Sequence, residues 1–86
     1  MRQQYLKDTD FYKTSDLPLA TVISLYYPLE VVDKTNPRRA FFVFKRGEKL
    51  DELIEKYYKR ELKVDPATFF ERLSFIKSRL YAEKDL

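Results

Sequence analysis

Residues 40–45 read Ala-Phe-Phe-Val-Phe-Lys, and this stretch decides the fold. Aromatic and β-branched side chains are typical of β-strands. Because successive side chains of a strand point to opposite faces, Phe42 and Phe44 share one face, and Phe41 and Val43 share the other. Both faces are apolar, so we expect both to be covered, either by helices or by another chain.

Two further strands are predicted before this one. Residues 29–34 form a second strand, joined to residues 40–45 by Thr-Asn-Pro-Arg-Arg at 35–39, where Asn-Pro favours a turn. The short stretch Phe-Tyr-Lys-Thr at residues 11–14 is a third strand candidate. We therefore expect an antiparallel hairpin, or a three-stranded antiparallel sheet.

A first helix is predicted over residues 17–26, which are apolar almost all round and therefore indicate a helix that is buried on most sides. The hydroxyl group of Thr14 or Ser15 can cap its first turn. Asp16 then lies within that turn, where a negative charge suits the helix dipole. Pro28 ends the helix, because proline cannot continue the helical hydrogen bonding.

Two amphipathic helices are predicted in the C-terminal half. One covers residues 48–61, and its apolar stripe consists of Leu50, Leu53, Ile54, Tyr57 and Tyr58. The other opens with Asp65 as N-cap and Pro66 as first helical residue. Its apolar stripe consists of Phe69, Leu73, Ile76 and Leu80.

These elements make one α+β domain over residues 11–82, with the order β-α-β-β-α-α and three helices packed on the strands. A chain of 86 residues is long enough for one core. We expect residues 1–10 to be flexible and residues 83–86 to form a charged tail.

The chain lacks the residues that most enzymes and metal sites use. It has no Cys and no His, so the commonest metal ligand and the commonest general base are absent. Gly47 is its one glycine, which excludes a glycine-rich phosphate loop, and Ser15 has no base beside it. We therefore expect no catalysis, no cofactor and no metal site.

Nothing in the chain predicts a membrane protein. The N-terminus lacks the apolar stretch of a secretion signal, and no apolar run approaches the roughly 20 residues that cross a bilayer. We expect a cytoplasmic protein without membrane association. Abundant Lys and Glu, with one Asn and two Gln, resemble the usage of thermophile proteins.

Positive charge gathers in residues 34–49, where six basic residues stand against one Glu. Lys and Arg that contact phosphates supply most sequence-independent affinity for nucleic acid. We therefore predict a non-catalytic accessory module that binds DNA or RNA, or else a solubilising hairpin tip. The candidate nucleic-acid-binding residues are Lys34, Arg38, Arg39, Lys45, Arg46 and Lys49.

Large apolar side chains exceed what a core on one sheet face would use. Either three helices wrap both faces of the sheet, or the surplus forms a surface that contacts a second copy of the chain or another protein. In the second interpretation the domain is a protein-interaction or homodimerisation module. The candidate interface residues are Phe41, Val43, Phe70, Phe75 and Tyr81.

Residues 12–20, Tyr-Lys-Thr-Ser-Asp-Leu-Pro-Leu-Ala, resemble the opening pattern Tyr-x-Thr-x-Asp-Leu-x-Leu-Ala of a family of small domains of unknown function from prokaryotes and their mobile elements. Residues 42–44 are similar to its Phe-x-Phe strand, and Tyr57-Tyr58 and Val64-Asp65-Pro66 to its C-terminal half. The resemblance covers roughly residues 11–81 and implies a self-contained fold, without an activity, cofactor or site residues. The family often has Gly where this chain has Tyr27-Pro28.

Overall fold

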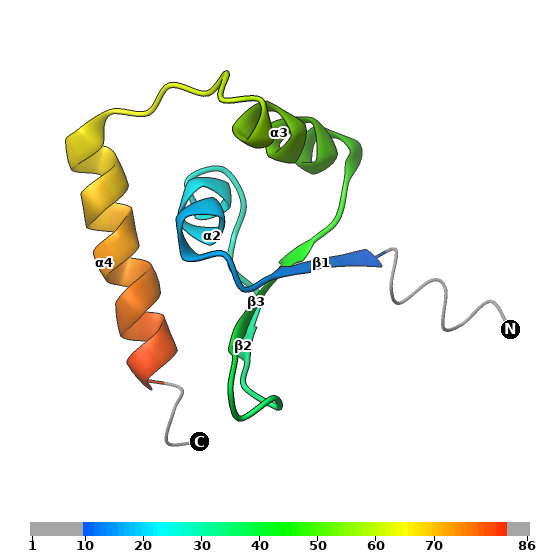
Figure 1. Cartoon of the computed structure of the whole chain (residues 1–86), viewed down its shortest axis with the longest axis vertical. Coiled ribbons are helices and arrows are strands. Elements are labelled where there is room, and N and C mark those ends of the chain that lie inside the picture. The colour runs from blue at the N-terminus through cyan, green and yellow to red at the C-terminus, as the bar shows by residue number, and fades with distance from the viewer. Residues whose placement is uncertain (1–9, 83–86) are drawn as a thin grey trace, which may run out of the picture.

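The computed structural model describes residues 10–82, which form three strands and three helices (Figure 1). In chain order these are β1 (Phe11–Thr14), α2 (Leu17–Ser24), β2 (Val31–Asp33), β3 (Phe41–Lys45), α3 (Glu48–Tyr58) and α4 (Pro66–Ala82). The predicted α+β class and the order β-α-β-β-α-α are confirmed. The expectations for residues 1–9 and 83–86 concern residues outside the described range.

The three strands form one antiparallel sheet in which β3 lies between β1 and β2. The register places Lys13 opposite Val43 and Val43 opposite Val31. Because residues directly opposite each other share a face, the register divides the sheet into two faces. The inner face consists of Tyr12, Thr14, Val32, Phe42 and Phe44. The outer face consists of Phe11, Lys13, Val31, Asp33, Phe41, Val43 and Lys45.

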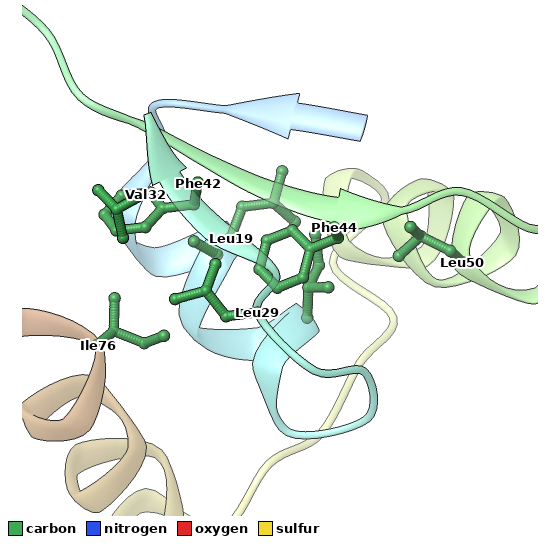
Figure 2. Close-up of a cluster of buried hydrophobic side chains, with 9 residues drawn as sticks. Leu19, Leu29, Val32, Phe42, Phe44, Leu50 and Ile76 are labelled. Atoms are coloured by element: carbon green, nitrogen blue, oxygen red, sulfur yellow. The ribbon is translucent and has the colours of Figure 1, made fainter. Parts of the chain in front are cut away.

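The hydrophobic core lies on the inner face (Figure 2). Leu19, Ala20 and Ile23 of α2 pack there against Phe42 and Phe44. The other two helices each add one fully buried side chain, and these are Leu50 of α3 and Ile76 of α4. The predicted apolar stripes of both helices are confirmed in this respect, since each stripe contains the side chain that reaches the core.

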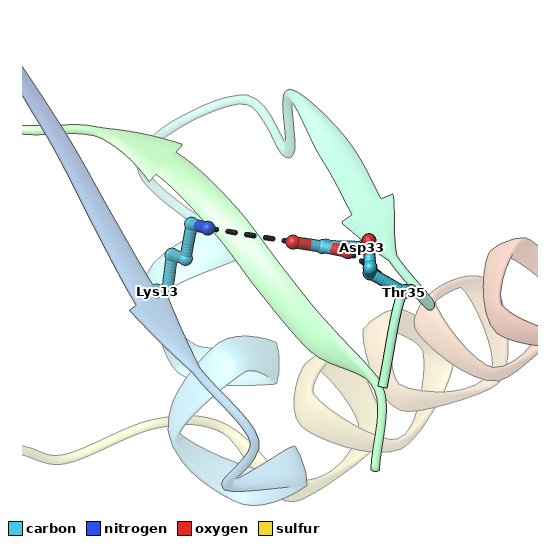
Figure 3. A network of polar contacts seen from close by, with 3 residues as sticks. All are labelled: Lys13, Asp33 and Thr35. Carbon is cyan, nitrogen blue, oxygen red and sulfur yellow. Dashed lines mark hydrogen bonds and ion pairs between the residues drawn. The ribbon is translucent and has the colours of Figure 1, made fainter. Parts of the chain in front are cut away.

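All three helices lie on one side of the sheet. α3 and α4 pack against α2 rather than against the second face of the sheet. α2 and α4 lie behind the strands in the view of the Lys13–Asp33 pair (Figure 3). The expectation that helices cover both faces is therefore wrong for residues 10–82, because α2 takes up the apolar surface that α3 and α4 present.

The N-cap of helix α2 is Asp16, one residue after Ser15 and two after Thr14, the two predicted caps. Asp16 has an extended backbone, and its Oδ1 accepts a hydrogen bond from the backbone N–H of Leu19 at 3.1 Å. Thr14 belongs to β1, and its hydroxyl oxygen accepts from the N–H of Asp16 at 3.0 Å. The prediction of Thr14 or Ser15 as the N-cap is wrong, because Thr14 is held in the sheet.

The ends of α3 and α4 are set by local hydrogen bonds. Arg60 has a left-handed backbone with φ of 61°, and α3 ends three residues before the predicted boundary at residue 61. The N–H groups of Arg60 and Glu61 donate to the carbonyls of Tyr57 and Lys56, which is a Schellman motif. Asp65 caps α4 as predicted, since its Oδ2 accepts from the N–H of Thr68 at 3.0 Å.

Candidate interaction surface

The outer face of the sheet is an apolar surface that the described helices leave uncovered. Its central residue, Val43, is 6% exposed and lies between Lys13 and Val31 in one cross-strand row. Phe11 and Val31, on the two edge strands, are 39% and 46% exposed. A shallow groove of about 890 Å³ follows β2 and crosses to β1 between these side chains. The outer face therefore offers a partner an apolar centre with accessible flanks.

One ion pair crosses the outer face. Lys13 Nζ on β1 lies 3.4 Å from Asp33 Oδ2 on β2, on the far side of β3 (Figure 3). The hydroxyl and backbone N–H of Thr35 donate to the Asp33 carboxylate, and together with Lys13 they hold the pKa of Asp33 below its ordinary value. An exposed pair of this kind adds little stability. It does balance two charges on a surface that is otherwise mostly apolar.

Three of the candidate nucleic-acid-binding residues lie at or near the β2–β3 turn. Arg38 and Arg39 are exposed there, and the backbone N–H of Arg38 donates to Asn36 Oδ1 in the turn. Lys34 is less accessible to a phosphate, because its Nζ donates to the backbone carbonyl of Leu80 near the end of α4, at 2.6 Å. The turn therefore presents two exposed arginine side chains that form no ion pair with residues 10–82.

The other three basic residues lie at the opposite end of β3. The guanidinium group of Arg46 lies 5.4 Å from the centre of the Tyr12 ring and 3.9 Å from Asp51. Lys45 ends β3, and Lys49 lies in the first turn of α3. A strand rises about 3.3 Å per residue, so the stretch from Arg39 to Lys45 spans roughly 20 Å. The six cations form two separate groups rather than one patch around the turn.

The predicted interface residues are also divided among different surfaces. Phe41 and Val43 lie on the outer face. Phe70 and Tyr81 are 63% and 62% exposed on α4 and, at about 100° of rotation per residue, point in nearly the same direction. Phe75 points roughly 140° away from Phe70, and Arg72 stacks on its ring at 5.3 Å. The structure therefore does not unite the sheet residues with those of α4.

Sequence reasoning missed four residues of the outer face, namely Phe11, Lys13, Val31 and Asp33. Their alternation along two short strands is visible in the sequence. Only the cross-strand register, however, shows that they share a face with Val43.

A group of tyrosines lies beside β1, on the helix side of the sheet. Burial raises the pKa of Tyr12, and the nearby Tyr58 adds to the effect. Burial also raises the pKa of Tyr57, assisted by the negative charge of Asp16. The rings of Tyr57 and Tyr58 meet edge to face at 5.2 Å. The raised pKa values keep the Tyr12 and Tyr57 phenols neutral at physiological pH.

Two further classes of site are not found in the part of the chain that the structure describes. Residues 10–82 contain no group of three or more carboxylate, His or Cys residues that could hold a metal ion. None of the helices within that range has the length and apolar character needed to cross a bilayer.

A family model for a domain of unknown function, DUF5659, matches residues 9–82, which include every helix and strand described above. The chain belongs to the DUF5659 family. The match confirms the resemblance to a family of unknown function, while the opening pattern and the mobile-element setting stay predictions. No curated protein and no solved structure matches this DUF5659 domain.

Proposed function

We propose that this DUF5659 domain is a non-catalytic, cytoplasmic protein-interaction module and that the outer face of its sheet receives the partner. One observation carries the proposal. All three helices lie on the inner face, so that Phe11, Val31 and the half-buried Phe41 remain accessible on the other side, around the buried Val43. Exposed apolar surfaces of this kind mark sites of protein contact.

The charges of the outer face favour a protein partner over a nucleic acid. Affinity for a phosphate backbone comes from clustered Lys and Arg side chains. On the outer face Lys13 is paired with Asp33, and Lys45 lies at the rim. A partner that presents apolar side chains to Val31 and Val43, with polar groups toward the Lys13–Asp33 pair, matches this surface.

Site-specific photo-crosslinking in the native host tests the proposal. A photoreactive benzophenone amino acid is placed at Val31, and a matched control carries it at Phe70 on α4, which is more exposed than Val31. We expect a discrete protein adduct from position 31 that is absent from position 70. That adduct should disappear when Phe41→Lys is added to the outer face. Equal adducts from both positions, or none from position 31, contradict the proposal.

Nucleic-acid binding is the second candidate, and it is supported by the adjacent exposed side chains of Arg38 and Arg39 at the hairpin tip. Binding of a random oligonucleotide at low and moderate salt tests it, with DNA and RNA compared. In that case the double variant Arg38→Glu, Arg39→Glu should lose binding, while Lys45→Glu, Lys49→Glu at the far end of β3 should retain most of it. No retention of wild type at low salt ends this candidate.

A further inference from the structure

Strand β1 forms an open edge of the sheet. The backbone N–H of Arg46 donates to the carbonyl of Asp10 at 2.8 Å, which identifies residues 10 and 46 as a hydrogen-bonded pair of the β1–β3 ladder. Such pairs alternate along antiparallel strands. Tyr12 and Thr14 therefore also direct their backbone groups toward β3, and Phe11 and Lys13 direct theirs away from the sheet.

The outward groups of Phe11 and Lys13 have no partner within residues 10–82. They comprise two N–H donors and two C=O acceptors in alternation. On the opposite edge, the side chain of Lys34 just after β2 donates to the carbonyl of Leu80 in α4, so α4 lies close to the end of that strand. The edge of β1 is thus the place at which the sheet can extend by another strand.

The edge of β1 is complementary to itself. A two-fold axis beside Tyr12 places Phe11 of one copy opposite Lys13 of the other, in an antiparallel pair. Phe11 and Lys13 then exchange both of their backbone hydrogen bonds with the second copy, which makes four bonds for the dimer. This arrangement satisfies all the outward groups of both residues at once.

The side chains of β1 also favour the register centred on Tyr12. A lysine on an edge strand usually opposes pairing, and a register with Lys13 opposite Lys13 would bring like charges together. In the register centred on Tyr12, each Lys13 instead faces a Phe11 ring, where cation–π attraction is available. The two Tyr12 residues become a non-hydrogen-bonded pair, and such aromatic pairs stabilise antiparallel strands.

We propose that two copies of this chain pair through their β1 strands and form one six-stranded antiparallel sheet. The helices of both copies remain on one side, and the two outer faces join into a single apolar surface. This inference deepens the proposed function and rests on it: the joined surface binds a partner only if the outer face of each copy does.

Sedimentation equilibrium up to millimolar concentration tests the pairing with two variants of one residue. Lys13→Pro removes the outward N–H donor while leaving every β1–β3 hydrogen bond in place, and proline is tolerated at such edge positions. Lys13→Ala removes the same side chain and the same ion pair but retains the donor. We expect dimers for wild type and Lys13→Ala, and a dimer Kd raised by roughly tenfold or more in Lys13→Pro, because two of the four bonds are lost.

Single-cysteine crosslinking tests the register and does not depend on a proline variant that folds. The Cα atoms of a non-hydrogen-bonded pair lie about 4.5 Å apart, which suits a disulfide. The chain has no Cys of its own. Tyr12→Cys should therefore form an intermolecular disulfide under mild oxidation. The matched variant Phe11→Cys should not form one. In this register residue 11 lies opposite residue 13 of the second copy, so the two introduced cysteines are separated by two residues along the strand.

The outcomes separate the pairing from the outer-face proposal. A wild type that stays monomeric at millimolar concentration, or dimers that persist unchanged in Lys13→Pro, overturn β1 pairing. So does a disulfide from Phe11→Cys in place of Tyr12→Cys. A dimer abolished by Val31→Lys and unaffected by Lys13→Pro shows pairing through the outer face itself, which supports the proposed function and overturns the edge pairing. Absence of adducts from position 31 contradicts the proposed function and leaves the sedimentation result intact.

Discussion

Ile76 is the one side chain of α4 that is fully buried, and it joins the core cluster with Leu19 and Phe42. Replacing Ile76 by Ala removes three carbon atoms from this site. At about 0.8 kcal/mol for each buried methylene, with a further cost for the cavity, the expected loss is about 3–4 kcal/mol. A domain of this length has roughly 4–13 kcal/mol of stability in total. The substitution should therefore remove a large share of it.

Urea and thermal unfolding followed by circular dichroism at 222 nm measures the effect of Ile76→Ala. Its melting temperature should fall by at least about 12 °C, since 1 kcal/mol corresponds to roughly 4–8 °C in a domain of this size. Phe70→Ala is the matched control on the same helix, because Phe70 is 63% exposed, and we expect it to cost about 1 kcal/mol or less. Equal costs for the two variants would refute the reasoning that α4 is attached to the core through Ile76.

Three further predictions concern single residues. Arg60→Gly should raise stability by about 0.5–1 kcal/mol in thermal unfolding. Arg60 holds a left-handed backbone that costs a residue with a side chain about 1–2 kcal/mol, and glycine avoids this cost but loses about 0.5–1 kcal/mol more backbone entropy on folding. An unchanged or lower melting temperature contradicts this. Asp16→Ala should cost about 1 kcal/mol through loss of the α2 cap, while Asp16→Asn stays within a few tenths; equal losses would show that the cap is not the cause. The pKa of Asp33 is lowered by its hydrogen bonds from Thr35, so its stabilisation is present above the ordinary value of 3.8 and is lost as the pH falls through the lower folded value. The melting temperature of wild type should therefore exceed that of Asp33→Asn at neutral pH and converge with it in acid; a difference that persists in acid has another origin.

Local periodicity was sufficient to predict most of the fold. The alternation of residues 41–44 placed Phe42 and Phe44 on one face, which the structure shows to be the inner one. The helical spacing around Leu50 and Ile76 identified the stripes that reach the core. Each of these signals lies within one element, where the side-chain period is fixed by backbone geometry. The element order follows from the same local patterns, and it was predicted for the same reason.

The candidate site depended on relations between elements, and these could not be predicted from local patterns. Lys13 and Asp33 meet across β3 only because the register brings three strands together. Conversely, Arg39 and Arg46 are close in the sequence but are separated in space, since an extended strand lies between them. The N-cap of α2 also depends on tertiary context, because the pairing of β1 holds Thr14 in the sheet.

The bond between Lys34 Nζ and the carbonyl of Leu80 joins two segments that are 46 residues apart in the chain. It fastens the last turn of α4 to the stem of the hairpin that carries Arg38 and Arg39. A ligand that pulls the hairpin away from its resting position must therefore strain or break this tie, and the C-terminal turn is then released. Displacement of the hairpin would in this way loosen the neighbouring last turn of α4, and amide hydrogen exchange in that turn would report it.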